Sequence, residues 1–313
     1  MRSSSSSKPS PPEQPYRAGP LAPRFFPLKA AVLTLLAFHS AEAAAPTSRS
    51  IKLSTWNLEW LLDENTPASR SAPLDIPARI PADYTLLAAF AARLNPDIAA
   101  LQEADDPNSL ALVFSHENYA VFTTDDTILQ RTGLAIRAGL SVTRHPDVQA
   151  LDITPPSAPH HLRSGLDMTV HFAHADLRVL VVHLKTGCWD DPPSQTHHAC
   201  PLLVRQFKVL SNWISERAQA GEAFAIMGDF NRRLNLQDPL FLSLQEKARL
   251  DLTTSGYASP CLGGSYFIDH IILGGAAIGW KEPDSLRVMP IPQGHGHQLS
   301  DHCPVSITLH LPA

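Results

Sequence analysis

Residues 223–234 read AFAIMGDFNRRL, and this stretch determines the fold that we expect. Its first five residues form an apolar run of the length of a strand buried on both faces. We expect Gly228 to break this strand before Asp229 and Asn231. If the backbone stays extended, Asp229 and Asn231 point the same way, because side chains repeat every two residues. A carboxylate and a carboxamide would then lie together at a strand end, where α/β proteins hold charged ligands. The alternative is an ordinary strand-to-turn junction, in which Asp, Asn and Gly are common.

The composition is that of a globular protein with a full hydrophobic core. Of the 313 residues, 44% are hydrophobic and 18% are charged, which is typical of such proteins. The length fits one large domain or two ordinary ones. The 28 prolines indicate many irregular connections.

The first 45 residues differ from the rest and have the pattern of an export signal. Residues 1–20 are polar and rich in Ser and Pro, so we expect disorder there. Arg24 and Lys29 precede the apolar run 30–38, which is too short to span a bilayer as a helix, and AEAAAP follows. This pattern predicts a secretory signal peptide cleaved at or near Ala45. Residues 46–313 would then form one domain, exported to the periplasm or secreted, with no membrane insertion after cleavage.

The charge of residues 46–313 argues against a general polyanion-binding protein. Residues 1–45 hold five of the 25 basic and two of the 30 acidic residues, so 20 basic and 28 acidic groups remain, a formal charge of −8. A protein that binds nucleic acid through a broad basic surface carries the opposite sign. A nucleic acid or phosphate substrate must therefore be held by a local site, together with a cation.

Four cysteines follow the predicted signal: Cys188, Cys200, Cys261 and Cys303. In an oxidising compartment, four cysteines allow three disulfide pairings. Cys188 and Cys200 bracket a short loop, so a disulfide between them is the simplest choice. Cys261 with Cys303 is the complementary pair, unless both are buried free thiols.

The order of the expected elements suggests a layered α/β protein. Hydrophobic periodicity and turn residues predict strands at 51–57, 97–101, 119–123, 133–137, 166–173, 177–184, 223–227, 266–273 and 304–311. The same signals predict helices at 84–94, 201–220 and 239–248. The clearest helix is 201–220, because Pro201 suits the first helical position and Gly221 suits the end.

Polar residues recur at the strand ends, except that Asp269 lies within its expected strand. The set is Asn57, Glu103, His183, Asp229, Asn231, Asp269, Asp301 and His302. Carboxylates and carboxamides without a thiolate suit Mg²⁺ or Mn²⁺ better than Zn²⁺. The two histidines, with Asp269 available to orient one of them, supply proton transfer. A hard cation, a general base and amide donors are the groups that phosphoryl hydrolysis requires.

Each of these residues also has a purely structural interpretation. Asn57 could cap a turn, Glu103 could be a solvated strand end, and His183 could be a hydrogen-bonded core histidine. Asp269 lies in an apolar strand, where an unpaired carboxylate is costly, so we expect it to have a partner. The eight positions taken together favour a functional site.

Six motifs in chain order carry a resemblance to a known family: STWNLEW, ALQEAD, VVHLKTG, IMGDFNRRL, FIDHIIL and LSDHCPV. Residues 51–309 resemble the endonuclease/exonuclease/phosphatase superfamily, which includes DNase I. GDFN and SDH at this separation are the specific motifs, and the others support them. The resemblance implies a DNase I-like four-layer α/β/β/α sandwich of two mainly antiparallel sheets, with one active site between the sheet edges. It also implies a Mg²⁺- or Mn²⁺-dependent phosphoric ester hydrolase.

The resemblance further implies a metal and substrate site. Glu103 would be the main metal carboxylate, with contributions from Asn57 and Asp301. Glu59 lies where some members carry a second acid. Arg131, Arg163 and Lys185 would bind substrate phosphate.

The catalytic roles implied by the resemblance fall on five residues. Asp229 would position or deprotonate the attacking water, and Asn231 would hydrogen-bond the scissile phosphate. His302 would act as base or phosphate ligand, oriented by Asp269. His183 would stabilise the transition state or protonate the leaving oxygen, although no acidic partner for it is evident in the sequence.

We therefore expect a monomeric, metal-dependent phosphodiesterase, most simply a secreted or periplasmic nuclease that hydrolyses nucleic acid. A phosphatase or lipid phosphodiesterase of the same fold is the alternative. A remoter alternative is a zinc-binding protein that uses His295, His297 and His302, with His197 and His198. A non-catalytic binding protein on the same fold is a further one.

Overall fold

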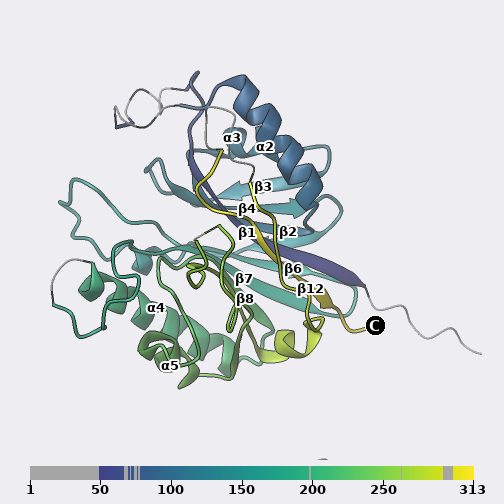
Figure 1. Cartoon of the computed structure of the whole chain (residues 1–313). Coiled ribbons are helices and arrows are strands. Elements are labelled where there is room, and N and C mark those ends of the chain that lie inside the picture. Colours follow the sequence, from purple (N-terminus) through teal and green to yellow (C-terminus); the bar gives the residue numbers. More distant parts are fainter. Residues whose placement is uncertain are drawn as a thin grey trace, which may run out of the picture. The chain divides into compact units, whose positions relative to one another are not determined.

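The computed structural model describes residues 49–66, 70, 72–73, 76, 78–196, 199–261, 263–291 and 299–313. These residues contain two six-stranded sheets packed face to face (Figure 1). The strand order is β11-β12-β1-β2-β4-β3 in the first sheet and β5-β6-β7-β8-β10-β9 in the second. Neighbouring strands are antiparallel except for the pairs β1–β2 and β7–β8, which are parallel. The predicted signal peptide, residues 1–45, lies outside the described residues and stays a prediction.

The first sheet contains β1 (Ser50–Leu61), β2 (Ile98–Ala104), β3 (Tyr119–Thr123), β4 (Arg131–Arg137), β11 (Arg287–Val288) and β12 (Val305–His310). The second contains β5 (Ser141–Arg144), β6 (Leu166–His171), β7 (Asp176–His183), β8 (Phe224–Asp229), β9 (Leu250–Leu252) and β10 (Asp269–Gly274). The α-helices are α2 (Pro81–Leu94), α3 (Pro107–Val113), α4 (Cys200–Gln219) and α5 (Pro239–Gln245). Two 3₁₀ helices are η1 (Gln149–Leu151) and η2 (Gly275–Trp280).

Strand β8 is buried on both faces, which confirms the interpretation of the apolar run. Phe224 and Ile226 pack toward α4 and α5, whereas Ala225 and Met227 pack between the two sheets. This division follows from the two-residue repeat of strand side chains. Gly228, expected to break the strand, instead lies within it. A Cβ atom at Gly228 would lie 1.9 Å from the carbonyl oxygen of Val182 in β7, so only glycine allows β7 and β8 to approach this closely.

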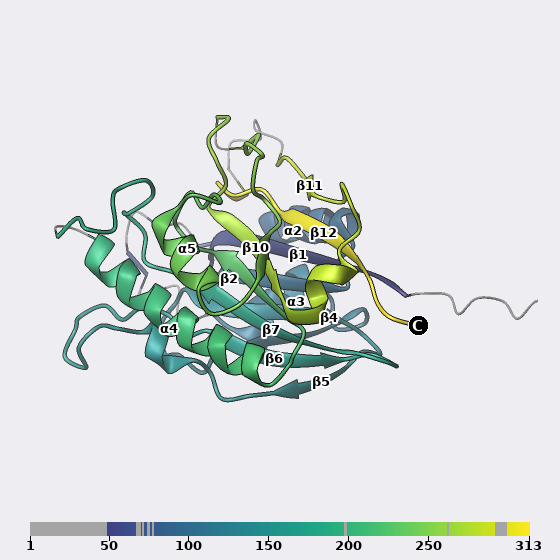
Figure 2. The same ribbon diagram turned by 90° about the horizontal axis from the view of Figure 1, so that it is seen from below.

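Three apolar clusters lie between the four layers of the fold. One lies between the sheets, one under α2 and α3 on the outer face of the first sheet, and one under α4 and α5 on the outer face of the second. Figures 1 and 2 show α2 and α3 on the side of β1–β4, and α4 and α5 on the side of β7 and β8. The α/β/β/α sandwich of two mainly antiparallel sheets is thus confirmed.

Helix α4 illustrates why the sequence folds as it does. Leu203, Phe207, Leu210 and Ile214 recur with helical spacing and are all buried in the cluster under the helix. A proline stands in its first turn, where a missing N–H costs nothing. Gly221 follows its end at φ +69°, a conformation that glycine adopts without strain.

The predicted strand at 266–273 begins three residues too early. Strand β10 starts at Asp269, where its register with the antiparallel partner β8 begins opposite Asp229. Beyond this pair a single backbone hydrogen bond, from the Phe230 N–H to the Ile268 carbonyl at 2.9 Å, continues the contact. Tyr266 instead forms an isolated bridge with Ala258. Asp269 therefore lies at a strand end and not within its strand. This correction places it directly opposite Asp229. The converse holds for Asn57, which was expected to end its strand but lies within β1.

Candidate active site

Strand register brings the predicted polar residues together from both sheets. Strands β1 and β2 of the first sheet supply Asn57 and Glu103. In the second sheet, the β7–β8 register places His183 beside Asp229. The β8–β10 register places Asp269 on the other side of Asp229. Residues that are far apart in the chain therefore meet where the two sheets face each other.

Asn57 bridges the two sheets with its side-chain amide. Its Nδ2 donates to Glu103 Oε1 at 3.1 Å and to Asp229 Oδ2 at 3.2 Å. Its Oδ1 accepts the backbone N–H of Glu59 at 3.0 Å. Two carboxylates on one side and an N–H donor on the other fix this orientation of the amide. In the structure Asn57 thus directs donors, not its oxygen, toward the carboxylates.

Glu103 is held by three hydrogen bonds and an unusual backbone. Its φ is +65°, a left-handed conformation that is uncommon for a residue other than glycine. Oε2 accepts from the backbone N–H of Trp60 at 3.1 Å and from Gln130 Nε2 at 2.6 Å. Oε1 accepts from Asn57, and His183 Nε2 lies 3.7 Å from it. The carboxylate therefore keeps acceptor capacity on Oε1, which faces the histidine.

Asp229 and Asn231 lie side by side, although not for the predicted reason. The strand ends at Asp229, and Asn231 has φ +50°, so the backbone turns and does not stay extended. The backbone N–H of Asn231 donates to Asp229 Oδ1 at 2.7 Å, and its Nδ2 donates to Oδ2 at 3.1 Å. The turn is closed by an aspartate accepting from the backbone two residues on. The two side chains meet through this local hydrogen-bonding pattern.

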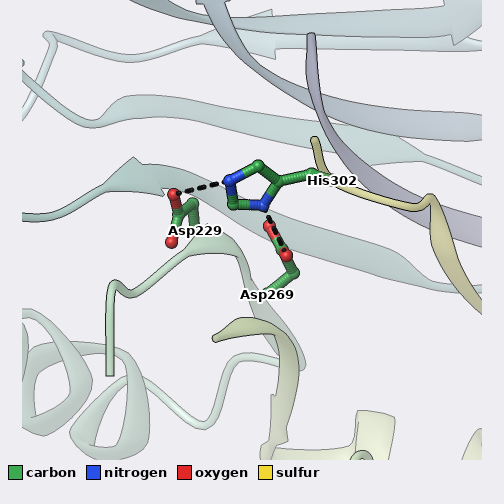
Figure 3. Close-up of side chains that lie close together, drawn as sticks. All are labelled: Asp229, Asp269 and His302. Atoms are coloured by element: carbon green, nitrogen blue, oxygen red, sulfur yellow. Dashed lines mark hydrogen bonds and ion pairs between the residues drawn. The ribbon is translucent and has the colours of Figure 1, made fainter. Parts of the chain in front are cut away.

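His302 lies between two carboxylates, as Figure 3 shows. Its Nδ1 is 2.8 Å from Asp269 Oδ2, and its Nε2 is 3.9 Å from Asp229 Oδ2. Asp269, expected to need a partner, has this one. Ser300 fixes the loop that carries the histidine: its Oγ donates to the Asn57 carbonyl at 2.7 Å and accepts the His302 N–H at 3.0 Å. The dyad of His302 and Asp269 thus joins a loop of the first sheet to a strand of the second.

The environment separates the pKa values of the two histidines. Burial lowers the pKa of His302, but the carboxylates of Asp269, Asp229 and Asp301 together outweigh it, so the pKa lies well above the usual value. Burial lowers the pKa of His183 well below its usual value, and the charges of Arg163 and His302 act in the same direction. Burial and the charge of Asp269 raise the pKa of Asp229. His302 is therefore protonated at neutral pH, and His183 is neutral.

His183 presents Nε2 to the centre of the site. That nitrogen lies 3.7 Å from both Glu103 Oε1 and Asp229 Oδ2. Its Nδ1 is buried, and no hydrogen-bond partner for it occurs among the described residues. This agrees with the lack of an evident acidic partner in the sequence. A neutral imidazole with Nε2–H facing carboxylates acts as a hydrogen-bond donor.

The donor set fits a hard divalent cation. Glu103, Asp229 and Asp269 are carboxylates at the same site, and none forms an ion pair with a Lys or Arg of the described residues. Asp269 Oδ1 is buried without a hydrogen-bond partner in that part of the chain. Oxygen atoms of Asp229 and Asp269 and a nitrogen of His302 all lie within 4.8 Å of one another. His302 is the one cationic side chain paired with these three carboxylates among the described residues, so negative charge remains, which is costly when buried and which Mg²⁺ or Mn²⁺ would neutralise.

Two predicted metal ligands lie at the edge of the site. Glu59 is half-buried, and the backbone N–H of Asp301 hydrogen-bonds to it. Burial and the charge of Asp301 raise the pKa of Glu59. Asp301 is exposed, with Oδ1 3.6 Å from His302 Nε2. Both carboxylates lie near the centre of the site. Neither accepts a hydrogen bond from the Asn57 amide, as Glu103 and Asp229 do.

The three predicted phosphate-binding cations differ in position. Arg163 donates from Nη2 to Gln130 Oε1 at 2.6 Å, which connects it to Glu103 through Gln130. Lys185 Nζ donates to the Thr186 carbonyl at 2.9 Å, and burial together with the charge of Arg163 lowers its pKa. Arg131 Nε donates only weakly, at 3.3 Å, to the carbonyl of Ile128. Arg163 therefore lies at the site, whereas Lys185 and Arg131 lie at its periphery.

A comparison with protein families identifies this set of residues. The sequence profile of the Endonuclease/Exonuclease/phosphatase family matches residues 54–302. The chain belongs to this family. The match begins just before Asn57 and ends at His302, so it spans the whole site. A search of curated proteins gave no match.

Solved structures share the fold at low sequence identity. Truncated TDP2 from Caenorhabditis elegans is 16% identical, with a TM-score of 0.56 over 83% of this chain and 98% of that one. TDP2 from D. rerio, complexed with single-strand DNA product, is 17% identical, with a TM-score of 0.55 over 83% and 98%. The human Nocturnin catalytic domain with bound sulfate is 15% identical, with a TM-score of 0.54 over 83% and 93%. These likenesses establish the DNase I-like fold of the Endonuclease/Exonuclease/phosphatase family.

Two disulfides flank the site of this family member. Cys188 is bonded to Cys200 across 12 residues, and Cys261 to Cys303 across 42. Cys303 directly follows His302, so the second bridge ties the loop that carries His302 to the segment that leads into β10. Cys261 and Cys303 are therefore not free thiols.

Sequence reasoning missed three residues that support the site. Gln130 links Glu103 to Arg163, and Ser300 holds the loop of His302. The buried guanidinium of Arg79 donates to the carbonyls of Leu58, Glu59 and Leu299. Gln130 precedes a strand and Arg79 lies in a Pro-rich connection, so neither carries a periodic signal.

The zinc alternative stays a prediction. His295, His297, His197 and His198 all lie outside the described residues. The Nδ1 atom of His302 is paired with Asp269.

Within the part of the chain that the structure describes, no helix is both long and apolar enough to cross a membrane.

Proposed function

We propose that this protein is a metal-dependent phosphodiesterase, and most specifically an exported nuclease. The observation that supports this best is the group of three carboxylates, Glu103, Asp229 and Asp269, next to two histidines whose pKa values are shifted in opposite directions. Such a set can hold a hard cation, accept a proton from water and donate hydrogen bonds to a phosphate. Membership of the Endonuclease/Exonuclease/phosphatase family supports phosphoric ester hydrolysis.

A nucleic acid is the substrate that we favour. A TDP2 structure of the same fold contains a single-strand DNA product, which supports a phosphodiester backbone as the substrate. The formal charge of −8 on residues 46–313 excludes a broad cationic surface, so the backbone would be held at the site itself. Arg163, with Lys185 close by, supplies the local positive charge. A phosphatase or lipid phosphodiesterase remains the alternative outcome of the test below.

In the proposed mechanism, Asp229 accepts the proton of the attacking water. Its raised pKa suits this role, because a base works best when its pKa lies near the working pH. The water oxygen forms a bond to phosphorus as the bond to the leaving oxygen breaks. Asn231 holds the carboxylate of Asp229 through two hydrogen bonds. A bound Mg²⁺ or Mn²⁺, with Glu103 as the main ligand, would neutralise the developing negative charge.

The two histidines have different roles in this proposal. His302, protonated and oriented by Asp269, stabilises negative charge on the phosphoryl oxygens. His183, neutral and buried, donates a hydrogen bond from Nε2 to the phosphate and does not act as a proton source. The leaving oxygen then takes its proton from solvent. This assignment follows from the pKa directions of the two imidazoles.

We propose that the protein is exported and acts as a monomer. The predicted signal peptide at residues 1–45 and the two disulfides support export, because disulfides persist in oxidising compartments. A monomer is sufficient because one chain supplies every site residue named above. Mass spectrometry of the exported protein would test cleavage at Ala45.

Cleavage of supercoiled plasmid by residues 46–313 with Mg²⁺ tests the proposed function. The Asp229→Ala variant and an EDTA control accompany it. We expect nicking that requires both Asp229 and the metal ion. Hydrolysis of bis-p-nitrophenyl phosphate without nicking would retain the chemistry and move the substrate to lipids or small esters. Activity that resists EDTA would contradict the metal-dependent mechanism, and no activity on either substrate would favour a binding protein.

A further inference from the structure

Gln130 forms the shortest polar contacts of the site, and the mechanism proposed above gives it no role. It directly precedes β4 and is half-buried. Its Nε2 donates to Glu103 Oε2 at 2.6 Å, and its Oε1 accepts from Arg163 Nη2 at 2.6 Å. A carboxylate can only accept and a guanidinium can only donate, so these partners determine which way the amide points.

On the Glu103 side, Gln130 helps to determine which carboxylate oxygen is available. Gln130 and the backbone N–H of Trp60 both donate to Oε2. An oxygen of a carboxylate has two favourable acceptor directions, so these donors fill Oε2. Among the described residues, Oε1 accepts only the Asn57 amide at hydrogen-bond distance. Gln130 thereby orients the carboxylate so that Oε1 faces the site.

On the Arg163 side, Gln130 holds a cation without neutralising it. No carboxylate of the described residues lies within ion-pair distance of Arg163, and its Nε is buried without a partner there. Burial lowers the pKa of Arg163, while the charges of Glu103, Asp229 and Asp126 raise it. An amide oxygen positions the guanidinium and leaves its charge available for an anion. A carboxylate at the same position would compete with that anion.

We infer that Gln130 is a positioning residue that couples the metal carboxylate Glu103 to the phosphate-binding cation Arg163. One amide sets the direction of both groups, so the distance between the bound cation and the bound phosphate depends on it. This inference rests on the proposed function. Outer-shell partners of this kind typically contribute 10- to 100-fold to metal affinity.

Two substitutions at Gln130 separate the two halves of this role. Gln130→Met keeps the length of the side chain but removes both hydrogen bonds. Gln130→Glu keeps an acceptor for Arg163, places a negative charge beside Glu103 and neutralises the guanidinium. Gln149→Met, at an exposed position of η1, is the matched control.

Calorimetric titration with Mn²⁺ in the absence of substrate, and kcat and KM on bis-p-nitrophenyl phosphate, are the measurements. We expect Gln130→Met to weaken Mn²⁺ binding roughly 10- to 100-fold and to raise KM. We expect Gln130→Glu to raise KM by about tenfold, because the new carboxylate pairs with Arg163 and the substrate phosphate loses one charge-assisted hydrogen bond. Its Mn²⁺ affinity should stay at or above that of the wild type, because the added negative charge offsets the lost donor to Glu103. Gln149→Met should match the wild type in both measurements.

Unchanged Mn²⁺ affinity and KM in Gln130→Met would overturn the inference and leave Gln130 as a loop residue. Should that variant unfold, an unchanged KM in Gln130→Glu would overturn it equally. A wild type that binds Mn²⁺ but hydrolyses no ester refutes only the proposed function, and the Mn²⁺ comparison still decides the role of Gln130. A wild type that binds no Mn²⁺ would refute both.

Discussion

Replacing Gly228 with Ala tests whether the close contact of β7 and β8 sets the geometry of the active site. The added Cβ would lie 1.9 Å from the Val182 carbonyl oxygen, and ordinary contact begins near 3.4 Å. The strands would therefore have to separate by about 1.5 Å, the difference between these distances. The next pair in the register is His183 and Asp229, so the separation would occur directly beside the site.

We expect Gly228→Ala to lower kcat at least 100-fold, because a displacement of about 1 Å at reacting groups costs roughly that factor. The positive φ of 150° adds about 1–3 kcal/mol of backbone strain. Gly139→Ala is the matched control: Gly139 has φ +88° and no atom within 4 Å of its added Cβ. The Gly139→Ala variant should have the backbone strain but not the steric clash, and should therefore retain full kcat. Phosphodiester hydrolysis and thermal unfolding of both variants measure this, and wild-type kcat in Gly228→Ala would refute the reasoning.

Three further perturbations have defined outcomes. Asp269→Asn removes the charge that raises the pKa of His302; kcat should fall about 10²- to 10⁴-fold with little change in melting temperature, and kcat within threefold of wild type would refute the dyad. Burial lowers the pKa of His270 to about 4, against about 6.5 when unfolded. Below pH 6.5 the unfolded state takes up a proton at His270 that the folded state does not bind. The free energy of unfolding should therefore fall by about 3 kcal/mol as the pH drops from 6.5 toward 4. Urea unfolding between pH 7 and 4 should show this loss in the wild type but not in His270→Gln; equal slopes would contradict it. Replacing Cys261 and Cys303 with Ser opens a 42-residue loop and should cost about 4 kcal/mol of unfolding free energy; an unchanged urea midpoint would show that the bridge adds no stability.

Most of the fold could be predicted because its strands and longer helices carry strong periodic signals. Strand 119–123 agrees at both ends with β3, and the helix at 201–220 differs from α4 by one residue at each end. The short elements α3, β5, β9 and β11 were missed. Helix α3 has seven residues, too few for a clear apolar face, and depends on Asp106 capping its first N–H groups. Such elements are determined by tertiary packing more than by their own sequence.

The candidate site was predictable where its residues lie near strand ends or in the family motifs. Glu103 and Asp229 follow from both signals, whereas Asn57, within β1, and His302, in a loop, follow from the family resemblance. Gln130 and Ser300 act through loops, where a side chain has no periodic position. Their roles depend on distances that arise only after the sheets pack. The register of β10 was also beyond the sequence, because its pairing with β8 sets where the strand begins.

The order in which the strands enter the two sheets has a consequence for synthesis. The first site residue lies in β1, whose register partner β12 comes near the end of the chain, so that Ser50 pairs with His310. His302 lies in the loop just before β12. A ribosome-bound chain that ends before this loop lacks both His302 and strand β12, which pairs with β1. The site of this protein therefore forms only after the segment that holds His302 and β12 has been made.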